Sequence, residues 1–271
     1  MNRLVWDSSL LITKDDMIDG DQFERLAGKY GLTYIETHEA RNRELSGCIL
    51  THNSDACILP KGKTIQPRLS EVRTYDYNWG NVPDSVRVWL AQNVDVRDER
   101  LIPIPIGLER DRWFPHLRKK EVILTLPDVE KTGLLYLNVN PETHWARPAL
   151  YEMFPWCTVE PGHNGARFLN YAWQIKRHKF VLCPDGNGMD THRTWETLYL
   201  GSYPIVQRHV FTEEFARILP LLIVDAWGEV TEQYLDSMYK DFASREWSWE
   251  ALKIDYWENL IKEKICSPYM M

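Results

Sequence analysis

A strand, a glycine-containing loop, a helix and a second strand follow one another over residues 179–206, and this order constrains the fold more than any other feature of the chain. The apolar run Lys179–Cys183 predicts a buried strand, and "PDGNGMD" after it predicts a loop. Thr191–Leu200 has a helical pattern that a glycine stops, and Tyr203–Val206 is again strand-like. Because strands joined through a helix pair in parallel, this stretch predicts a parallel α/β sheet.

The same alternation of short apolar runs and helical patterns extends along the chain, as is typical of α/β folds. In the first half we predict strands over Arg3–Trp6, Gly47–Thr51, Ala56–Leu59, Val86–Ala91 and Leu101–Ile106, and a helix over Gln22–Tyr30. In the second half we predict further strands over Gly133–Val139 and Leu221–Val224, helices over Arg147–Phe154, Thr231–Phe242 and Trp249–Ile265, and a helix capped by Asn164 that buries Phe168, Tyr171, Ala172 and Ile175.

Length and composition set the broad class. A chain of 271 residues suits one large domain or two small ones. The segment "IPIPIGLERDRWFPHLRKKE" is rich in proline and charge, so we predict a crossing there between two Rossmann-like halves, 1–125 and 126–271. The five cysteines form no CxxC pair, and no apolar run approaches the ~20 residues of a membrane span. We therefore expect a cytoplasmic protein without a transmembrane segment.

The loop after Lys179–Cys183 has the features of an anion site. In an open parallel sheet, ligands bind at the carboxyl ends of the strands. Gly186 and Gly188 allow close approach of a ligand, and the following helix offers free N–H groups. A cation at a helix N-terminus is unfavourable by the dipole rule, so Arg193 predicts an anionic partner such as a diphosphate. Glu196, one turn on, either accepts bonds from sugar or ribose hydroxyls or pairs with Arg193 on a solvated helix.

Two common nucleotide-binding patterns are absent. The chain has no GxxxxGK[ST] sequence, and "GNGMDT" places Thr191 where a GxGxxG loop needs a third small residue. Kinase and dehydrogenase functions are therefore disfavoured.

The segment "FVLCPDGNGMDTHRTWETLYLGSYPIV" resembles the donor-site signature of exostosin-like glycosyltransferases. The matching residues are Pro184, Gly186, Arg193, Glu196, Gly201, Pro204 and Val206. The run "GNG-x-D-T-H-R-x-W-E" is similar to the variant found in ribitol xylosyltransferase-like proteins. The resemblance covers about residues 165–262 and is looser over 47–115, where "ILTHNSD" and "AQNVDVRDERLIPIPIGLE" resemble the acceptor half.

This resemblance implies a GT-B-like fold, with two Rossmann-like halves facing across a cleft and a nucleotide sugar held by the C-terminal half. It implies metal-independent, usually inverting transfer, with no cofactor and with a UDP-sugar as the expected donor. The donor-binding residues it implies are Asn138, Asn140, Arg147, Gly186, Asn187, Gly188, Asp190, Thr191, His192, Arg193, Glu196 and Arg208. Arg147 and Arg208 also fit a role as surface residues.

Sugar transfer to a hydroxyl needs a base, and three side chains are candidates. His52 and Asp55 follow the strand Gly47–Thr51, and Asp76 lies among aromatic residues. For His52 and Asp55 the alternative is a local turn, in which such residues bond their own backbone. Asn93, after Val86–Ala91, either contacts the acceptor or caps the strand end.

The acceptor stays open at this point. A glycan or another hydroxyl-bearing molecule is expected, and hydroxymethylated bases of phage-type DNA are an alternative. Short basic runs occur at 60–68, 116–120 and 175–179, but they alternate with acidic residues and the net charge is -7, which favours a solvated surface. The alternative from another class is a module that binds a nucleotide sugar or glycan without turnover.

Overall fold

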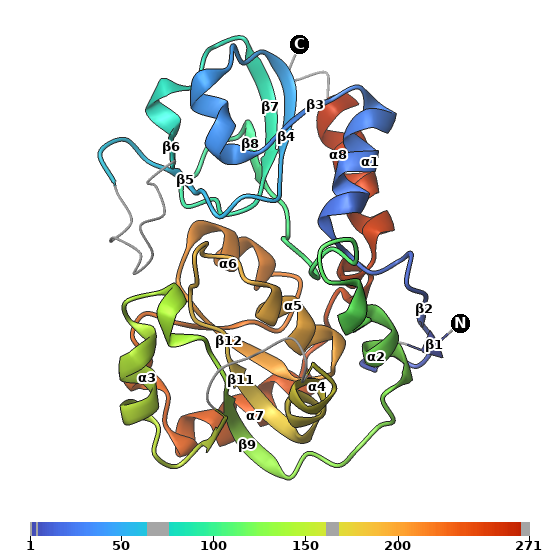
Figure 1. Ribbon diagram of the computed structural model, residues 1–271, viewed down its shortest axis with the longest axis vertical. Coiled ribbons are helices and arrows are strands. Elements are labelled where there is room, and N and C mark those ends of the chain that lie inside the picture. The colour runs from blue at the N-terminus through green and yellow to red at the C-terminus, as the bar shows by residue number, and fades with distance from the viewer. Residues whose placement is uncertain (1, 4, 64–75, 161–167, 267–271) are drawn as a thin grey trace.

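The two larger sheets of the described chain are parallel, and Figure 1 shows them one above the other. The computed structural model describes residues 2–3, 5–63, 76–160 and 168–266. The first sheet has the order β3-β4-β7-β8, with β3 over Thr33–Ile35, β4 over Gly47–Thr51, β7 over Val86–Ala91 and β8 over Leu101–Pro103. The second has the order β10-β9-β11-β12-β13, with β9 over Gly133–Leu137, β10 over Thr158–Val159, β11 over His178–Leu182, β12 over Tyr203–Gln207 and β13 over Leu222–Val224. The α/β class with parallel sheets is confirmed.

The second sheet contains a point at which the strand order reverses. The chain runs from β9 outward to β10, then returns past β9 to β11 on its other side, and continues through β12 to β13. In sheets of this kind the loops after the two strands beside the reversal diverge and leave a crevice. The loops that follow β9 and β11 are therefore where the topology places a ligand.

Alternate residues of the second sheet enter two different cores. Leu135, Leu137 and Phe180 pack on one side with Leu150 of α3 (Arg147–Met153) and Leu235 of α7 (Glu232–Ser244). Their neighbours in sequence point to the opposite face, which is covered by α4 (Phe168–Arg177), α5 (His192–Tyr199) and α6 (Val210–Phe215). Successive side chains of a strand point to opposite faces of the sheet, and here the residues on both faces are apolar, so both faces are buried.

The opposite core continues into the first sheet. There, Trp89 of β7 lies in one cluster with Phe23 of α1 (Gly20–Tyr30) and with Trp257 of α8 (Ile254–Cys266). Tyr77 and Trp79 pack their rings against Trp89, at centroid distances of 4.8 Å and 5.8 Å. The remaining elements are β1 (Asn2–Arg3), β2 (Leu11–Ile12), β5 (Ile58–Leu59), β6 (Tyr77–Asn78) and α2 (Lys119–Thr125), with 3-10 turns at Thr37–Asn42, Trp79–Asn81, Pro115–Leu117, Pro141–Thr143, Trp227–Glu229 and Trp249–Leu252.

Each sheet is covered in part by a helix that lies far from it in the chain or in the segment between the two sheets. Helix α8, the last element in the chain, packs on α1 and β7 of the first sheet, whereas α2 packs on α4 of the second. Figure 1 shows α8 in red beside α1 in blue. The two sheets are therefore linked by packing as well as by the chain between them.

Several predicted boundaries were wrong for physical reasons. The strand predicted over Leu101–Ile106 ends at Pro103, because Pro103 and Pro105 have no N–H to donate. The strand predicted over Arg3–Trp6 is limited in the described residues to Asn2–Arg3, which pairs with β2. The helix predicted over Trp249–Ile265 is interrupted at Lys253, which is extended.

Other predictions have simpler outcomes. The first strand of the first sheet, β3, was missed, since three residues carry too little pattern. Asn164 lies outside the described residues. In the described part of the chain, no helix combines the length and the apolar character that a membrane span requires.

Candidate functional site

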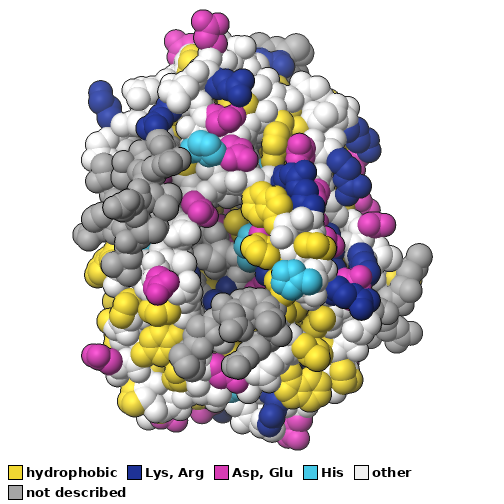
Figure 2. Space-filling view, in the orientation of Figure 1, with side chains coloured by type: hydrophobic (Ala, Val, Ile, Leu, Met, Phe, Trp, Pro, Cys, Tyr) yellow, Lys and Arg dark blue, Asp and Glu magenta, His cyan; other side chains and the backbone are white. Residues whose placement is uncertain are grey.

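A pocket of about 360 Å³ opens at the carboxyl ends of β9 and β11, beside the reversal in strand order. The residues that line it come from the loop after β9, from the starts of α3 and α5, from α4, and from the segment that crosses between the halves: Glu109, Phe114, Leu117, Lys119, Asn140, Arg147, Tyr171, Thr191, His192, Arg193 and Glu196. Figure 2 gives a space-filling view in the orientation of Figure 1, in which hydrophobic, histidine and basic side chains lie close together near the centre right of the face.

Arg193 is a partly buried cation whose charge no described carboxylate neutralises. Its Nη1 donates to the Tyr171 hydroxyl at 3.0 Å, and its guanidinium lies 5.2 Å from the centre of that ring. Its Nε is buried and has no hydrogen-bond partner in the described structure. A buried donor left without an acceptor costs about 1–3 kcal/mol, more for a charged group. The side chain is therefore prepared for an anionic ligand.

Arg147 places a second positive charge nearby and holds the loops together. It donates to the carbonyl oxygens of Asn140, Pro184 and Asp185 at 3.2, 3.0 and 2.7 Å. Burial, and next the charge of Arg193, lower the pKa of Arg147 to about 10. Two guanidinium groups thus repel each other at one sheet edge, and a bound anion relieves that repulsion.

Three further polar atoms at the same edge lack partners among the described residues. They are Oδ1 of Asn138, Oδ1 of Asn187 and Oγ1 of Thr191, and all are buried. Thr191 occupies the N-cap position of α5, yet its side chain does not cap the helix. Most buried polar atoms in native proteins are satisfied, so unpartnered atoms that gather at one sheet edge favour a ligand site there.

Glu196 is neutralised by a lysine of the crossing segment. Its Oε1 accepts from Nζ of Lys119 at 2.8 Å, and its Oε2 accepts from the Tyr171 hydroxyl at 3.0 Å. Glu196 and Lys119 are both buried. The alternative in which Glu196 pairs with Arg193 on a solvated helix is wrong, because the described ion pair is with Lys119.

The opposite wall of the pocket carries Glu109 and His192. The Nδ1 atom of His192 lies 2.8 Å from the Gly107 carbonyl oxygen, and its Nε2 lies 3.6 Å from Oε2 of Glu109. Glu109 belongs to the segment after β8, whereas His192 begins α5. This wall is therefore built from both halves.

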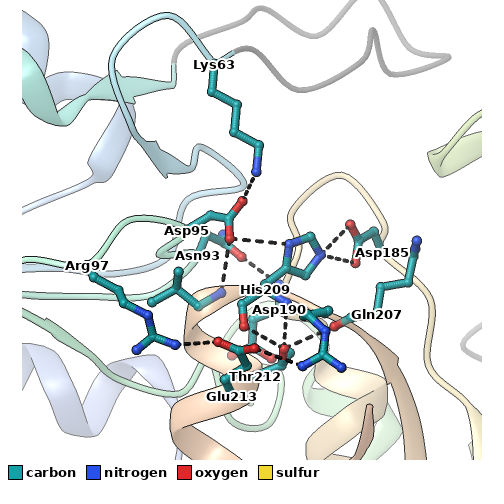
Figure 3. Close-up of polar contacts among 12 residues, drawn as sticks. Lys63, Asn93, Asp95, Arg97, Asp185, Asp190, Gln207, His209, Thr212 and Glu213 are labelled. Carbon is teal, nitrogen blue, oxygen red and sulfur yellow. Dashed lines mark hydrogen bonds and ion pairs between the residues drawn. The ribbon is translucent and has the colours of Figure 1, made fainter. Parts of the chain in front are cut away.

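A polar joint fixes the loop after β11 against the first sheet (Figure 3). The Asp190 N–H donates to Oδ1 of Asn93 at 2.7 Å, and the Asp190 carboxylate accepts from the Ile106 N–H at 2.7 Å. The Trp195 indole N–H also donates to it, at 3.0 Å. Burial raises the pKa of Asp190 to about 7, although these hydrogen bonds oppose the shift. Asp190 therefore acts as a strut between the sheets.

His209 makes a second joint, also drawn in Figure 3. Its Nε2 lies 3.0 Å from Asp185, in the loop after β11, and its Nδ1 lies 3.8 Å from Asp95 of the first half. Burial lowers the pKa of His209, but hydrogen bonds to Asp185 and Asp95 outweigh it and raise the pKa to about 9. For Asp95, burial is outweighed by bonds from His209 and Lys63, which lower its pKa to about 2. The cationic ring therefore ties the glycine loop to the first sheet.

The residues predicted to bind the donor differ in where the structure places them. Asn140, Arg147, Thr191, His192, Arg193 and Glu196 line the pocket. Gly186 and Gly188 make room for neighbours, because a Cβ would lie 2.9 Å from Nη2 of Arg147 and 2.8 Å from Nδ2 of Asn93. Arg208 lies elsewhere, where Asp225 and Glu213 neutralise it at 2.6 and 2.8 Å.

The three candidate bases do not line this pocket. His52 is fully buried, with its ring nitrogens 3.1 Å from Asn53 Oδ1 and 2.9 Å from the Pro105 carbonyl oxygen. Burial lowers its pKa to about 4. Asp76 accepts the Cys57 N–H at 2.8 Å, and Asp55 is exposed. The contacts of His52 and Asp76 therefore hold neighbouring segments of the first half in place.

Sequence reasoning overlooked Lys119 and Glu109. Lys119 was counted in a basic run expected on the solvated surface, but it is buried against Glu196, and Lys120 is buried against Asp19. Glu109 was quoted only as part of the proline-rich crossing. A signal was present, since both belong to the charged segment that was predicted to cross from the first half to the second.

No family model matches the chain, and no curated protein sequence matches it.

Proposed function

We propose that the pocket is the donor site of a glycosyltransferase that moves a sugar from a nucleoside diphosphate to an acceptor hydroxyl. The observation that carries the proposal is the unneutralised Arg193, with its orphaned Nε, beside Arg147 at the strand-order reversal. The resemblance of residues 183–206 to an exostosin-like donor signature directs the choice to a nucleotide sugar, with a UDP-sugar as the expected donor. In this proposal the two parallel sheets act as the two halves of a GT-B-like enzyme.

The chemistry follows from the charges. When the bond from sugar to diphosphate breaks, negative charge develops on the leaving oxygen. In this proposal Arg193, on the wall of the pocket, makes a paired, charge-assisted contact with that diphosphate, and Thr191 Oγ1 and the N–H groups that begin α5 add donors. Glu196, oriented by Lys119 and Tyr171, keeps acceptor positions for sugar or ribose hydroxyls.

Water must be kept from the reacting carbon, since it competes with the acceptor. The contacts of Asp190 with Asn93 and of His209 with Asp95 join the two halves next to the loop that precedes α5. They therefore support the expectation that transfer takes place between closed halves.

The test is a thermal-shift and calorimetry series on the full chain. The ligands are UDP, GDP, CDP, their common sugar conjugates and inorganic pyrophosphate, each with Mg²⁺ and with a chelator. At a ligand concentration of about 100 times Kd, binding stabilises the fold by ~2.7 kcal/mol. In a chain of this size that raises the melting temperature by roughly 5–10 °C. One nucleotide is expected to stand out, and its sugar conjugate is expected to bind as well.

The matched variants are Arg193→Met and Arg43→Met, the second replacing an exposed arginine that pairs with Glu39. Losing the bidentate contact is expected to weaken nucleotide binding about 100-fold in R193M, and not in R43M. If no nucleoside diphosphate stabilises the protein, or if R193M binds like the wild type, the proposal is wrong. Binding without any release of nucleoside diphosphate from the conjugate would favour the non-catalytic module.

A further inference from the structure

We propose that Glu109 accepts the proton of the attacking hydroxyl, and that His192 positions its carboxylate. This inference rests on the proposed function, because it assigns the base of that reaction. It names a residue on the wall of the pocket that the first half contributes.

The charges in the pocket single out Glu109. Glu196 is neutralised by Lys119 at 2.8 Å. In the described structure, by contrast, no lysine or arginine lies within ion-pair distance of Glu109, whose one such contact is with Nε2 of His192 at 3.6 Å. Among its described lining residues, the pocket therefore contains a guanidinium with an unpartnered Nε, on Arg193, and one carboxylate without a permanent cation, on Glu109. Transfer needs these two charges, one for the leaving diphosphate and one for the incoming proton.

The contact between Glu109 and His192 lacks a proton donor when the ring is neutral. Nδ1 of His192 faces the Gly107 carbonyl oxygen, which only accepts, so Nδ1 carries the hydrogen. Nε2 then presents a lone pair toward Oε2 of Glu109. A hydroxyl that binds beside this pair can donate its one hydrogen to the Glu109 carboxylate, and an acceptor hydroxyl is such a donor.

The backbone that carries Glu109 is held firmly. The Leu108 N–H donates to the Ile18 carbonyl oxygen at 2.8 Å, and Gly107 has a φ of 69° with no room for a Cβ. On the other side the buried Arg110 donates to the Gly20 carbonyl oxygen and the Tyr34 hydroxyl, each at 3.0 Å. The Glu109 side chain is 17% exposed, so it combines a fixed origin with access to the pocket.

The step balances without any further reagent. The acceptor oxygen forms a bond to the anomeric carbon, the bond from that carbon to the diphosphate oxygen breaks, and its electron pair leaves with the diphosphate beside Arg193. The hydroxyl proton passes to the Glu109 carboxylate, which later releases it to solvent. General base catalysis of this kind accounts for about 10²–10⁴-fold in rate.

The experiment measures release of nucleoside diphosphate from the conjugate identified by the thermal series, with water, glycerol or azide as nucleophile. Azide carries no proton, so its reaction needs no base. In Glu109→Gln the reactions with water and glycerol are expected to fall at least 100-fold, while azide restores release and nucleotide affinity stays within threefold of the wild type. Glu130→Gln, an exposed carboxylate outside the pocket, is the control and is expected to behave like the wild type.

Two more variants separate catalysis from folding. Glu109→Asp keeps the carboxylate and is expected to recover part of the rate with water and glycerol. His192→Gln is expected to lower kcat about tenfold while KM for the donor stays within twofold, because His192 positions Glu109.

The outcomes distinguish this inference from the function it rests on. If the wild type binds no nucleoside diphosphate, the proposed function fails, and this inference fails with it. If the wild type binds and turns over the donor but E109Q keeps its rate with water within threefold, Glu109 is not the base. The same conclusion follows if E109Q loses nucleotide binding, or if azide does not restore release.

Discussion

The carboxyl ends of β4 and β7 in the first sheet differ from those of β9 and β11 in the second. After β4 and β7 the side chains are mutually satisfied: His52 contacts Asn53 and the Pro105 carbonyl, and Asn93 donates to the Ser54 carbonyl at 3.1 Å. After β9 and β11, Asn138, Asn187 and Arg193 keep buried atoms without partners. Equivalent positions in two sheets of one class thus serve opposite purposes.

The difference shows what satisfied and unsatisfied polar groups do. A satisfied edge is a rigid support, because breaking it leaves donors and acceptors unpaired. An unsatisfied edge stores a cost that a ligand removes on binding. We expect substitutions at the supporting contacts to reduce stability, and substitutions at the orphaned atoms to reduce ligand binding.

The largest expected difference in stability is between variants of two neighbouring residues, one that makes supporting contacts and one whose side chain has an unpartnered atom. Asp190→Ala leaves the Ile106 N–H and the Trp195 indole N–H unpaired and buried, so we expect a loss of about 3 kcal/mol in the free energy of unfolding. Thr191→Ala removes an orphaned hydroxyl and is expected to change stability by less than about 0.5 kcal/mol. Denaturant unfolding of both variants checks this. Equal losses would remove the distinction between the two edges.

A smaller, pH-dependent effect is expected at the joint made by His209. Its folded pKa of about 9 lies above the unfolded value near 6.5, so the stabilisation is complete below about pH 6.5 and is lost as the pH rises through 9. His209→Gln is expected to cost about 2 kcal/mol at pH 6 and much less at pH 10. The measurement is unfolding across this pH range, with the exposed His116→Gln as control. A constant difference between H209Q and wild type would contradict the assignment.

The smallest effect concerns the fit of the glycine loop on its support. A Cβ at Gly188 would lie 2.8 Å from Nδ2 of the buried Asn93, so Gly188→Ala is expected to cost roughly 1–2 kcal/mol through displacement of this contact. Gly28, inside α1, has no atom within 4 Å of an added Cβ, and Gly28→Ala is expected to stabilise slightly. Melting temperatures of the two variants should move in opposite directions. Equal shifts would mean that the loop is not seated on Asn93.

Much of the fold could be predicted from local pattern. The strands at Gly47–Thr51 and Val86–Ala91 have the predicted bounds, and α5 lies within the predicted helix at Thr191–Leu200, because these segments carry a clear period and clear stop signals. The two-residue strands and Thr33–Ile35 were missed or overextended, since pairing in the tertiary structure defines such short strands.

The candidate site could be predicted only in part. Arg193 and Glu196 were identified because the glycines and the helix start are adjacent to them in sequence. Lys119, the partner of Glu196, lies 77 residues away and looked like part of a solvated basic run. His52 looked like a base because it follows a strand, yet its ring is buried and bonded on both sides.

The sequence by itself determined the parallel α/β class and the position of the glycine loop between β11 and α5, because periodicity, glycine placement and the helix start are local properties of the chain. The tertiary structure alone decided which charges are neutralised. Whether a carboxylate or guanidinium keeps its charge for a ligand depends on groups brought close from distant segments, as Lys119 is for Glu196. Glu109 stands out only once those partners are in place.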